Sequence, residues 1–244
     1  MNKEILNPGE RLDDLIINNM KIIQHEDEFR FSLDAVLLAH FATLKHGSAV
    51  IDLGTGTGII GLLLAARGAG FVTGIEINQR VAEMASRSVA LNGLSQKMDV
   101  INADLCNVKG YLSQGKYDLV VSNPPYRPVG GGLINPSGSL AIARHEVKAS
   151  LDDIIAAARH LVKYRGRFAM IHLPERMAEI LKKMSNADLE PKRLQVIYPK
   201  ADSKPTMVLV EGIRGAKAGL EVLPPFIIYK DDGSYSDAVM AYYK

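Results

Sequence analysis

The sequence contains no tryptophan and only one cysteine among its 244 residues. A single cysteine cannot form an intramolecular disulfide or a cysteine-based zinc site, so Cys106 indicates a reducing compartment and is expected to be buried and unreactive. Long apolar runs are also missing, since the run at 59–66 stops at Arg67, far short of a membrane span. The first residues lack the apolar core of a signal peptide. These absences predict a cytoplasmic protein that does not cross a membrane.

Metal-binding patterns and a strong overall charge are missing too. The six histidines form no His-x-Glu or His-x-x-x-His pair, which predicts no metal site. The net charge is only +2, but residues 1–58 carry five basic and nine acidic side chains, whereas residues 159–217, the basic region, carry thirteen and six. This excess suits a phosphate backbone, although scattered lysines commonly form an ordinary solvated surface. Both interpretations of the basic region stay open.

Strand-like and helix-like segments alternate along the chain, which is typical of an α/β fold with a parallel sheet and helices on both faces. Helical spacing is found at 59–67, 79–92, 151–162 and 177–184. The stretch at 127–140 is rich in glycine and proline and follows a strand, so we expect a substrate lid there. The expected strands are 49–52, 71–76, 99–102, 117–122, 167–172, 194–198, 206–212 and 226–230.

A glycine motif, Asp52-Leu-Gly-Thr-Gly-Thr-Gly58, follows the first core strand and leads into a helix. Ligands in open α/β sheets bind beyond the carboxyl ends of strands, where glycines let backbone amides approach them. The spacing differs from the dinucleotide fingerprint Gly-x-Gly-x-x-Gly, and Asp52 is placed to receive a ligand ammonium group. The motif therefore favours an amino-acid-bearing nucleoside over a pyrophosphate. The alternative is a tight turn that binds nothing.

Two further acids follow the next strands. Glu76 ends the second strand about 20 residues after the glycines, where a carboxylate accepts hydrogen bonds from ribose hydroxyls. Ile77 beside it is a candidate contact of the same nucleoside. Asp104, in Ala103-Asp104 after the third strand, is suited to accept from the amine of an adenine. A solvated charge for Glu76 and a helix N-cap for Asp104 are the alternatives.

The sharpest motif is Asn123-Pro-Pro-Tyr126, which follows the fourth strand. An adenine amino group is a poor nucleophile because its lone pair is delocalised into the ring. Two acceptors on its N–H bonds, the Asn123 side-chain oxygen and the Pro124 carbonyl, would direct that lone pair toward a methyl donor. Pro124 and Pro125 stiffen the loop, and Tyr126 offers a stacking face for a planar group. A proline turn that merely ends a strand is the alternative.

These motifs occur in the order found in class I S-adenosylmethionine-dependent amino-methyltransferases, which the chain resembles. Three segments are similar to the bacterial tRNA1(Val) adenine-37 N6-methyltransferase family: Phe31-Ser-Leu-Asp-Ala-Val-Leu-Leu-Ala39, Ala141-Ile-Ala-Arg-His-Glu146 and Tyr198-Pro-Lys-Ala-Asp-Ser-Lys-Pro205. The resemblance implies a Rossmann-like fold with a seven-stranded, mostly parallel sheet whose last strand, 206–212, is antiparallel. It also implies that segment 1–45 packs on the core near the donor site and that 46–244 form the methyltransferase domain.

The motifs and the resemblance together imply S-adenosylmethionine as cofactor and an adenine N6 in RNA as target, with the tRNA anticodon loop as the expected partner. The candidate catalytic residues are Asn123, Pro124, Pro125 and Tyr126. The candidate donor contacts are Asp34, Asp52, Gly54, Thr55, Gly56, Gly58, Glu76, Ile77, Ala103, Asp104 and Asn123. The candidate substrate contacts are Tyr126, Arg127, Arg144, His145, Lys200 and Lys204. Asp34 enters by resemblance alone, and a charged helix start for Arg144-His145 or solvated lysines are the alternatives for the last four.

Three other functions compete with this interpretation. A protein glutamine N5-methyltransferase presents a delocalised amide nitrogen to the same motif, but such enzymes usually carry a helical domain before the core and a Pro-Arg-Pro-Glu-type segment. Here fewer than 50 residues precede the first core strand, and the segment reads Phe31-Ser-Leu-Asp34. A non-catalytic nucleotide-binding module would be expected to lose the Asn-Pro-Pro-Tyr motif. A nicotinamide-dependent oxidoreductase is disfavoured by the glycine spacing.

Overall fold

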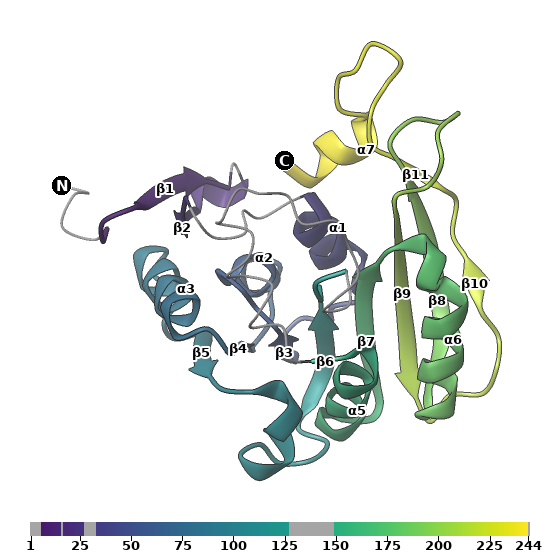
Figure 1. Ribbon diagram of the computed structural model, residues 1–244, viewed down its shortest axis with the longest axis horizontal. Helices are drawn as coiled ribbons and strands as arrows, with labels where there is room; N and C mark the ends of the chain where they lie inside the picture. Colours follow the sequence, from purple (N-terminus) through teal and green to yellow (C-terminus); the bar gives the residue numbers. More distant parts are fainter. Residues whose placement is uncertain (1–5, 16, 27–32, 127–148, 244) are drawn as a thin grey trace, which may run out of the picture.

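The computed structural model describes residues 6–15, 17–26, 33–126 and 149–243. At its centre lies a mixed sheet whose principal strands run in the spatial order β5-β4-β3-β6-β7-β9-β8 (Figure 1). They are parallel except for β9, which is antiparallel to both β7 and β8. The predicted α/β fold and the antiparallel strand at its expected place, β9, are confirmed, but the described sheet has nine strands instead of seven, because two short strands after β9 pair with β8. The principal strands are β3 (Ala49–Leu53), β4 (Phe71–Glu76), β5 (Met98–Asn102), β6 (Tyr117–Ser122), β7 (Val162–His172), β8 (Leu189–Tyr198) and β9 (Met207–Arg214).

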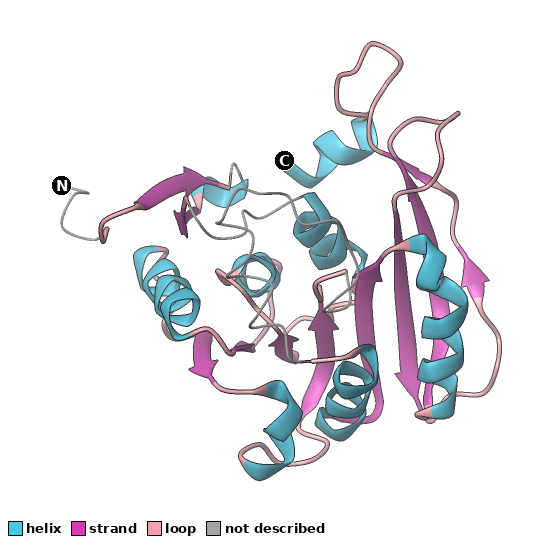
Figure 2. Ribbon diagram, viewed as in Figure 1, coloured by secondary structure: helices cyan, strands magenta, loops and turns pink. Residues whose placement is uncertain are grey.

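Helices cover both faces of the sheet (Figure 2). One hydrophobic core lies between the sheet and the helices α1, α2 and α3, and a second lies between the sheet and the helices α5 and α6. Successive strand residues point to opposite faces, so Leu119 and Val121 of β6 enter the first core while Val120 enters the second. The helices are α1 (Leu33–Phe41), α2 (Ile59–Ala66), α3 (Gln79–Leu91), α5 (Leu151–Leu161) and α6 (Met177–Asn186).

A hairpin of β1 (Glu10–Asp14) and β2 (Lys21–His25), joined through η1 (Ile17–Asn19), packs against α3. The Ile23 amide donates to the Ser88 hydroxyl at 2.9 Å, and Arg87 forms a two-pronged ion pair with Glu10. The Asn92 side chain, at the end of α3, bonds both backbone groups of Lys21. These contacts attach the N-terminal part of the described chain to the helix that follows Glu76.

The C-terminal segment folds over the same side of the molecule. Its short strands β10 (Glu221–Val222) and β11 (Phe226–Ile227) run parallel to β8, and α7 (Asp237–Met240) and η4 (Ala241–Tyr243) follow. Tyr242 stacks on His40 of α1 with ring centroids 4.0 Å apart, and its ring also stacks on Phe226 at 5.5 Å. The end of the chain therefore lies against α1, as Figure 1 shows.

Several elements differ from the expected bounds. Strand β7 begins at Val162, directly after α5. Strand β8 begins at Leu189, and its register shifts after Pro191, a residue that has no N–H to donate to the neighbouring strand. The strand expected at 226–230 has only two residues. The expectation of a buried cysteine is wrong, because Cys106 lies exposed in η2 (Leu105–Gly110). The residual burial and the neighbouring Asp104 raise its pKa to about 11, which keeps the thiol protonated at neutral pH.

Some expectations fall outside the described residues: the lid at 127–140 and the residues Arg127, Arg144 and His145. Within the described ranges, no helix is both long and apolar enough to cross a membrane. The same part of the chain holds no cluster of three or more histidine, cysteine or acidic side chains arranged to bind a metal ion.

Candidate active site

The candidate residues gather at the edge of the sheet where the parallel strands have their carboxyl ends. The strand order reverses between β3 and β6, since β4 and β5 extend to one side and β7 to the other. Such a reversal leaves a crevice outside the strand ends, which is the usual ligand site of open α/β sheets. The glycine motif follows β3 and the Asn-Pro-Pro-Tyr motif follows β6, so the two motifs flank this point. The Ser122 hydroxyl, donating to the Leu53 carbonyl at 2.9 Å, joins the two strand ends.

The glycine loop has a backbone that only glycine adopts without strain. Gly54, Gly56 and Gly58 have φ angles of 74°, 55° and 89°. A Cβ atom built on Gly54 or Gly56 would meet nothing within 4 Å, so open space lies beside both residues. At Gly58 a Cβ would lie 3.3 Å from the Ala85 side chain, which indicates a packing requirement against α3. The first two glycines therefore border the space that a ligand can fill.

Glu76 is held in place by the backbone around it. Its carboxylate accepts from the Gly56 amide and from the Asn78 amide, both at 2.9 Å. The Glu76 carbonyl accepts from the Ala103 amide at 3.0 Å and from the Asn102 side chain at 2.9 Å. These bonds tie the ends of β3, β4 and β5 together and fix the carboxylate beside the glycine loop, where ribose hydroxyls could donate to it.

Asp52 is the most deeply buried of the candidate residues, with no exposed surface. Its Oδ2 accepts from the Thr55 hydroxyl at 2.7 Å, whereas its Oδ1 has no hydrogen-bond partner among the described residues. Burial raises the pKa of this carboxyl to about 7, the Thr55 bond opposes the shift, and the charge of Glu76 adds to it. Asp52 thus helps to fix the glycine loop through Thr55. Its Oδ1 remains available as a hydrogen-bond acceptor.

The remaining donor candidates lie beyond β4 and β5. Asp104 caps η2 by accepting from the Cys106 amide at 2.9 Å, so the helix-cap alternative describes its local role. Ala103 is half-buried beside it. Ile77 is a large apolar side chain with 37% of its surface exposed, next to Glu76. An exposed apolar side chain at this place suits contact with a planar ligand group.

The structure brings Asn123, Tyr126 and Asp34 together. The Tyr126 hydroxyl lies 2.7 Å from Asn123 Oδ1 and 2.9 Å from Asp34 Oδ2. Burial, followed by the charge of Asp34 and the hydrogen bond to it, raises the pKa of Tyr126 far above its ordinary range, so the phenol stays protonated. Pro124 is buried and Pro125 is exposed. Asp34 belongs to the first turn of α1, a helix that sequence reasoning connected with the donor only by resemblance.

His172, at the carboxyl end of β7, is a site residue that the sequence did not reveal. Its ring meets the Tyr126 ring edge-on, with centroids 5.5 Å apart and planes at 62°. Burial lowers its pKa to about 4, with help from the nearby Arg176, so the ring is neutral at pH 7. Nδ1 accepts from the Leu173 amide at 2.7 Å, and Nε2 lies 3.4 Å from a guanidinium nitrogen of Arg176. No local motif marks this histidine, because only the pairing of β6 with β7 brings it to Tyr126.

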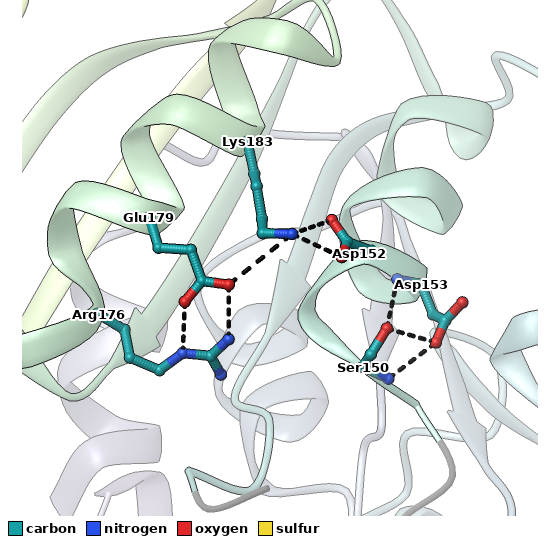
Figure 3. A network of polar contacts seen from close by, with 6 residues as sticks. All are labelled: Ser150, Asp152, Asp153, Arg176, Glu179 and Lys183. Atoms are coloured by element: carbon teal, nitrogen blue, oxygen red, sulfur yellow. Dashed lines mark hydrogen bonds and ion pairs between the residues drawn. The ribbon is translucent and has the colours of Figure 1, made fainter.

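A network of ion pairs and hydrogen bonds lies between α5 and α6, with Arg176 just before α6 (Figure 3). Arg176 pairs with Glu179 at 2.9 Å, and Lys183 reaches both Glu179 and Asp152. Ser150 and Asp153 form a capping box at the start of α5. These pairs are exposed, so each contributes little to stability.

Lys200 and Lys204 lie in the connection between β8 and β9, at the same carboxyl edge. Lys204 is exposed, and the Lys200 ammonium donates to the Asp231 carbonyl at 3.2 Å. Most other cations of the basic region form ion pairs with carboxylates of the same chain. Those paired with carboxylates are Arg159, Lys163, Arg167, Arg176, Lys183 and Arg193.

Comparison with known proteins agrees with this geometry. A family model described as the methyltransferase small domain matches residues 32–186. The chain belongs to the methyltransferase small domain family. It is 31% identical over 187 residues to a tRNA1(Val) (adenine(37)-N6)-methyltransferase of a Flavobacteriaceae bacterium, an alignment that covers 70% of this chain and 77% of the relative. A relative of the same name from Porphyromonas gingivalis is 30% identical over 217 residues, covering 85% of this chain and 84% of its own.

Solved structures share the fold of this methyltransferase. A predicted O-methyltransferase from Agrobacterium tumefaciens is similar with a TM-score of 0.68 and 24% identity, covering 86% of this chain and 95% of that one. A geranyl diphosphate C-methyltransferase from Streptomyces coelicolor, solved with S-adenosyl-L-homocysteine, has a TM-score of 0.57 and 13% identity, with coverages of 74% and 79%. Family and fold together make the chain an S-adenosylmethionine-dependent methyltransferase with a Rossmann-like fold.

Proposed function

We propose that this methyltransferase transfers a methyl group from S-adenosylmethionine to the exocyclic N6 of an adenine in the anticodon loop of a tRNA. The observation that carries the proposal is the position of Asn123 and Tyr126 across the β3–β6 crevice from the glycine loop. The relatives named for adenine-37 of tRNA1(Val) support the same target class.

The residues beside the glycine loop fit the donor. Open space borders Gly54 and Gly56, Glu76 is fixed where ribose hydroxyls would lie, and Ile77 is exposed for the adenine ring. The Oδ1 of Asp52 has no hydrogen-bond partner among the described residues, and we assign it to the ammonium group of the donor. When bound, S-adenosylmethionine supplies a sulfonium-activated methyl group. The contacts of Asp34, Asp104 and Ala103 with the donor stay predictions.

The residues that would bind the target amine explain how a poorly nucleophilic nitrogen attacks the methyl group. Asn123 Oδ1 and the Pro124 carbonyl accept the two N–H bonds of the target, which directs its lone pair out of the ring plane. Tyr126, braced by His172, offers a ring face to the base. The donor begins cationic and its charge disperses as the methyl moves, so alignment matters more than a dedicated base. The proton leaves to solvent after transfer.

A single-stranded loop suits this mechanism, because the target base must leave its stack to reach the crevice. Extrusion costs a few kcal/mol in a duplex and less for a base that is already unpaired. We place Lys200 and Lys204, with Arg127, Arg144 and His145, along the path of the RNA backbone. The lysines' shared edge with Asn123 and Tyr126 supports their part of this assignment.

The test supplies methyl-labelled donor and separate pools of unmodified tRNA, ribosomal RNA, DNA and cell protein to the purified chain, and digests each pool. N6-methyladenosine in the tRNA pool is the expected product. N5-methylglutamine in the protein pool would replace the proposal by the glutamine reaction. Donor binding without any labelled product would favour a non-catalytic nucleotide-binding module.

A further inference from the structure

The Tyr126 hydroxyl faces two acceptors although it has one proton to donate. Asn123 Oδ1 lies at 2.7 Å and Asp34 Oδ2 at 2.9 Å. A phenol donates fully to one acceptor at a time, so the proton is shared or alternates between the amide and the carboxylate. Both acceptors lie within hydrogen-bond distance of the hydroxyl at one position of the ring, which also contacts His172.

This sharing matters for the proposed reaction. Asn123 Oδ1 is the atom that would accept an N–H of the target amine, and a hydroxyl bonded to it occupies acceptor capacity and draws electron density from the amide oxygen. Once the hydroxyl donates to Asp34, the amide oxygen becomes available to the substrate. A carboxylate is the stronger acceptor, since hydrogen bonds to charged groups are shorter and stronger than neutral ones.

Asp34 is built into a firmly anchored helix. The end of α1 is fixed by Arg67, which donates to the Ala39 carbonyl, and by Arg193, which donates to the Phe41 carbonyl at 3.1 Å. Just beyond it, Thr43 bonds the fully buried Glu211 of β9 through both its amide and its hydroxyl. The Asp34 carboxylate thus reaches Tyr126 from a framework attached to α2 and to the far strands of the sheet.

We propose that Asp34 is a positioning residue that takes the Tyr126 hydroxyl when the substrate amine arrives, freeing Asn123 Oδ1 to accept from that amine and fixing the Tyr126 ring for stacking. The inference rests on the proposed function. In the substrate-free state the Tyr126 hydroxyl alternates between Asn123 and Asp34, and in the substrate complex it donates to Asp34 alone. The role differs from a donor contact, because Asp34 acts through Tyr126 and not through the cofactor.

The experiment is a double-mutant cycle of Asp34→Ala and Tyr126→Phe, with kcat and KM for tRNA and calorimetric Kd for S-adenosylmethionine. Asp34→Ala should lower kcat about tenfold, the scale of one hydrogen bond to a charged group, and leave the donor Kd within about twofold. In the Tyr126→Phe background it should cause no further loss of kcat, because no hydroxyl remains to be held. Asp34→Asn, which keeps an acceptor oxygen, should lose less than Asp34→Ala.

Asp152→Ala is the matched control, because Asp152 is the second residue of α5 after a leucine, as Asp34 is in α1. It removes an acid from a helix start without touching Tyr126, and it should leave kcat unchanged. The inference is overturned if the Asp34 and Tyr126 effects multiply independently, or if Asp34→Ala weakens donor binding at unchanged kcat.

Failure of the proposed function gives a different pattern. If the wild-type chain labels glutamine and not tRNA, the same cycle is run on that amide, which also presents two N–H bonds to Asn123, and the coupling is still expected. If the wild-type chain labels no substrate, the proposed function and the inference fall together.

Discussion

Asp52 places an ionisable group in the interior, with no cationic partner among the described residues. Its pKa of about 7 lies above the ordinary value of 3.8, so the folded chain holds the proton more tightly than the unfolded chain. The free energy of unfolding therefore falls as pH rises from about 4 to about 7, and it levels off above that range. Asp52→Asn removes this titration.

We expect the stability of the Asp52→Asn variant, relative to the wild type, to increase between about pH 5 and about pH 8 in urea unfolding experiments. The amide retains an oxygen for the Thr55 hydroxyl, so the difference isolates the buried charge. An identical stability difference at both pH values would contradict a carboxyl that titrates near neutrality.

Asn123 is expected to act on the reaction and not on the donor. Asn123→Ala removes one of two acceptors for the target amine, and we expect kcat to fall about a hundredfold, the scale for loss of a preorganised polar partner. The calorimetric Kd for S-adenosylmethionine should stay near the wild-type value. A parallel loss of donor affinity would show that Asn123 mainly holds the cofactor.

At the residue level, the sequence predicts those members of the site that belong to local motifs. The glycine loop and the Asn-Pro-Pro-Tyr motif lie directly after a strand and Glu76 ends one, so their common edge follows from the parallel fold. His172 carries no such signal, because its contact with Tyr126 depends on which strands become neighbours. The bond between Asp34 and Tyr126 is long-range for the same reason and joins residues 92 positions apart.

Among the elements, the glycine loop gives the clearest prediction. Gly56 has a φ of 55° and donates its amide to Glu76. Gly56→Ala adds left-handed strain of about 1–2 kcal/mol and puts a methyl group into the space assigned to the donor. We expect donor affinity to fall at least about tenfold, because a steric clash that costs about 1.4 kcal/mol of binding free energy corresponds to that factor.

Gly93→Ala is the control for that variant, because Gly93 has a φ of 68° with open space around it at the end of α3. Both variants should lose similar stability in thermal unfolding, whereas only Gly56→Ala should lose donor affinity by calorimetry. Equal donor affinity in the two variants would exclude the glycine loop as part of the donor site.

A comparison of predicted and observed strand bounds shows which sequence patterns are enough to locate a strand. Strands β4 and β6 match their predicted bounds, because each is a short, mostly apolar segment followed by turn residues. The β1–β2 hairpin was not predicted as strands, since its sequence lacks regular alternation and its apolar side chains, Leu12 and Ile23, are covered by α3. The start of β7 was predicted late because β7 follows α5 without a loop.

For the whole molecule, the charge pattern divides between two edges of the sheet. Lys217 follows β9, whose direction is opposite to that of β8, so Lys217 and Lys204 lie at opposite edges. Sequence composition places both lysines in one basic region, but Lys200 and Lys204 share the edge with Asn123, whereas Lys217 does not. The linear excess of positive charge is therefore not one continuous surface.

This arrangement predicts how salt affects tRNA binding. Lys204→Ala should weaken binding and reduce the slope of log affinity against log salt concentration by about one, the value for one lost phosphate contact. Lys217→Ala, which removes an exposed lysine from the other edge, should leave the slope unchanged. The reverse result in a salt titration would place the RNA at the amino ends of the strands.

The most direct test of the central claim maps the methyl group on a single RNA. Wild-type chain, S-adenosylmethionine and an unmodified tRNA transcript are incubated, and nuclease fragments are analysed by mass spectrometry. The account predicts one N6-methyladenosine, in the anticodon-loop fragment, and none when that adenine is replaced by guanine. A methyl group on another nucleotide, or N5-methylglutamine in protein with unmethylated tRNA, would contradict it.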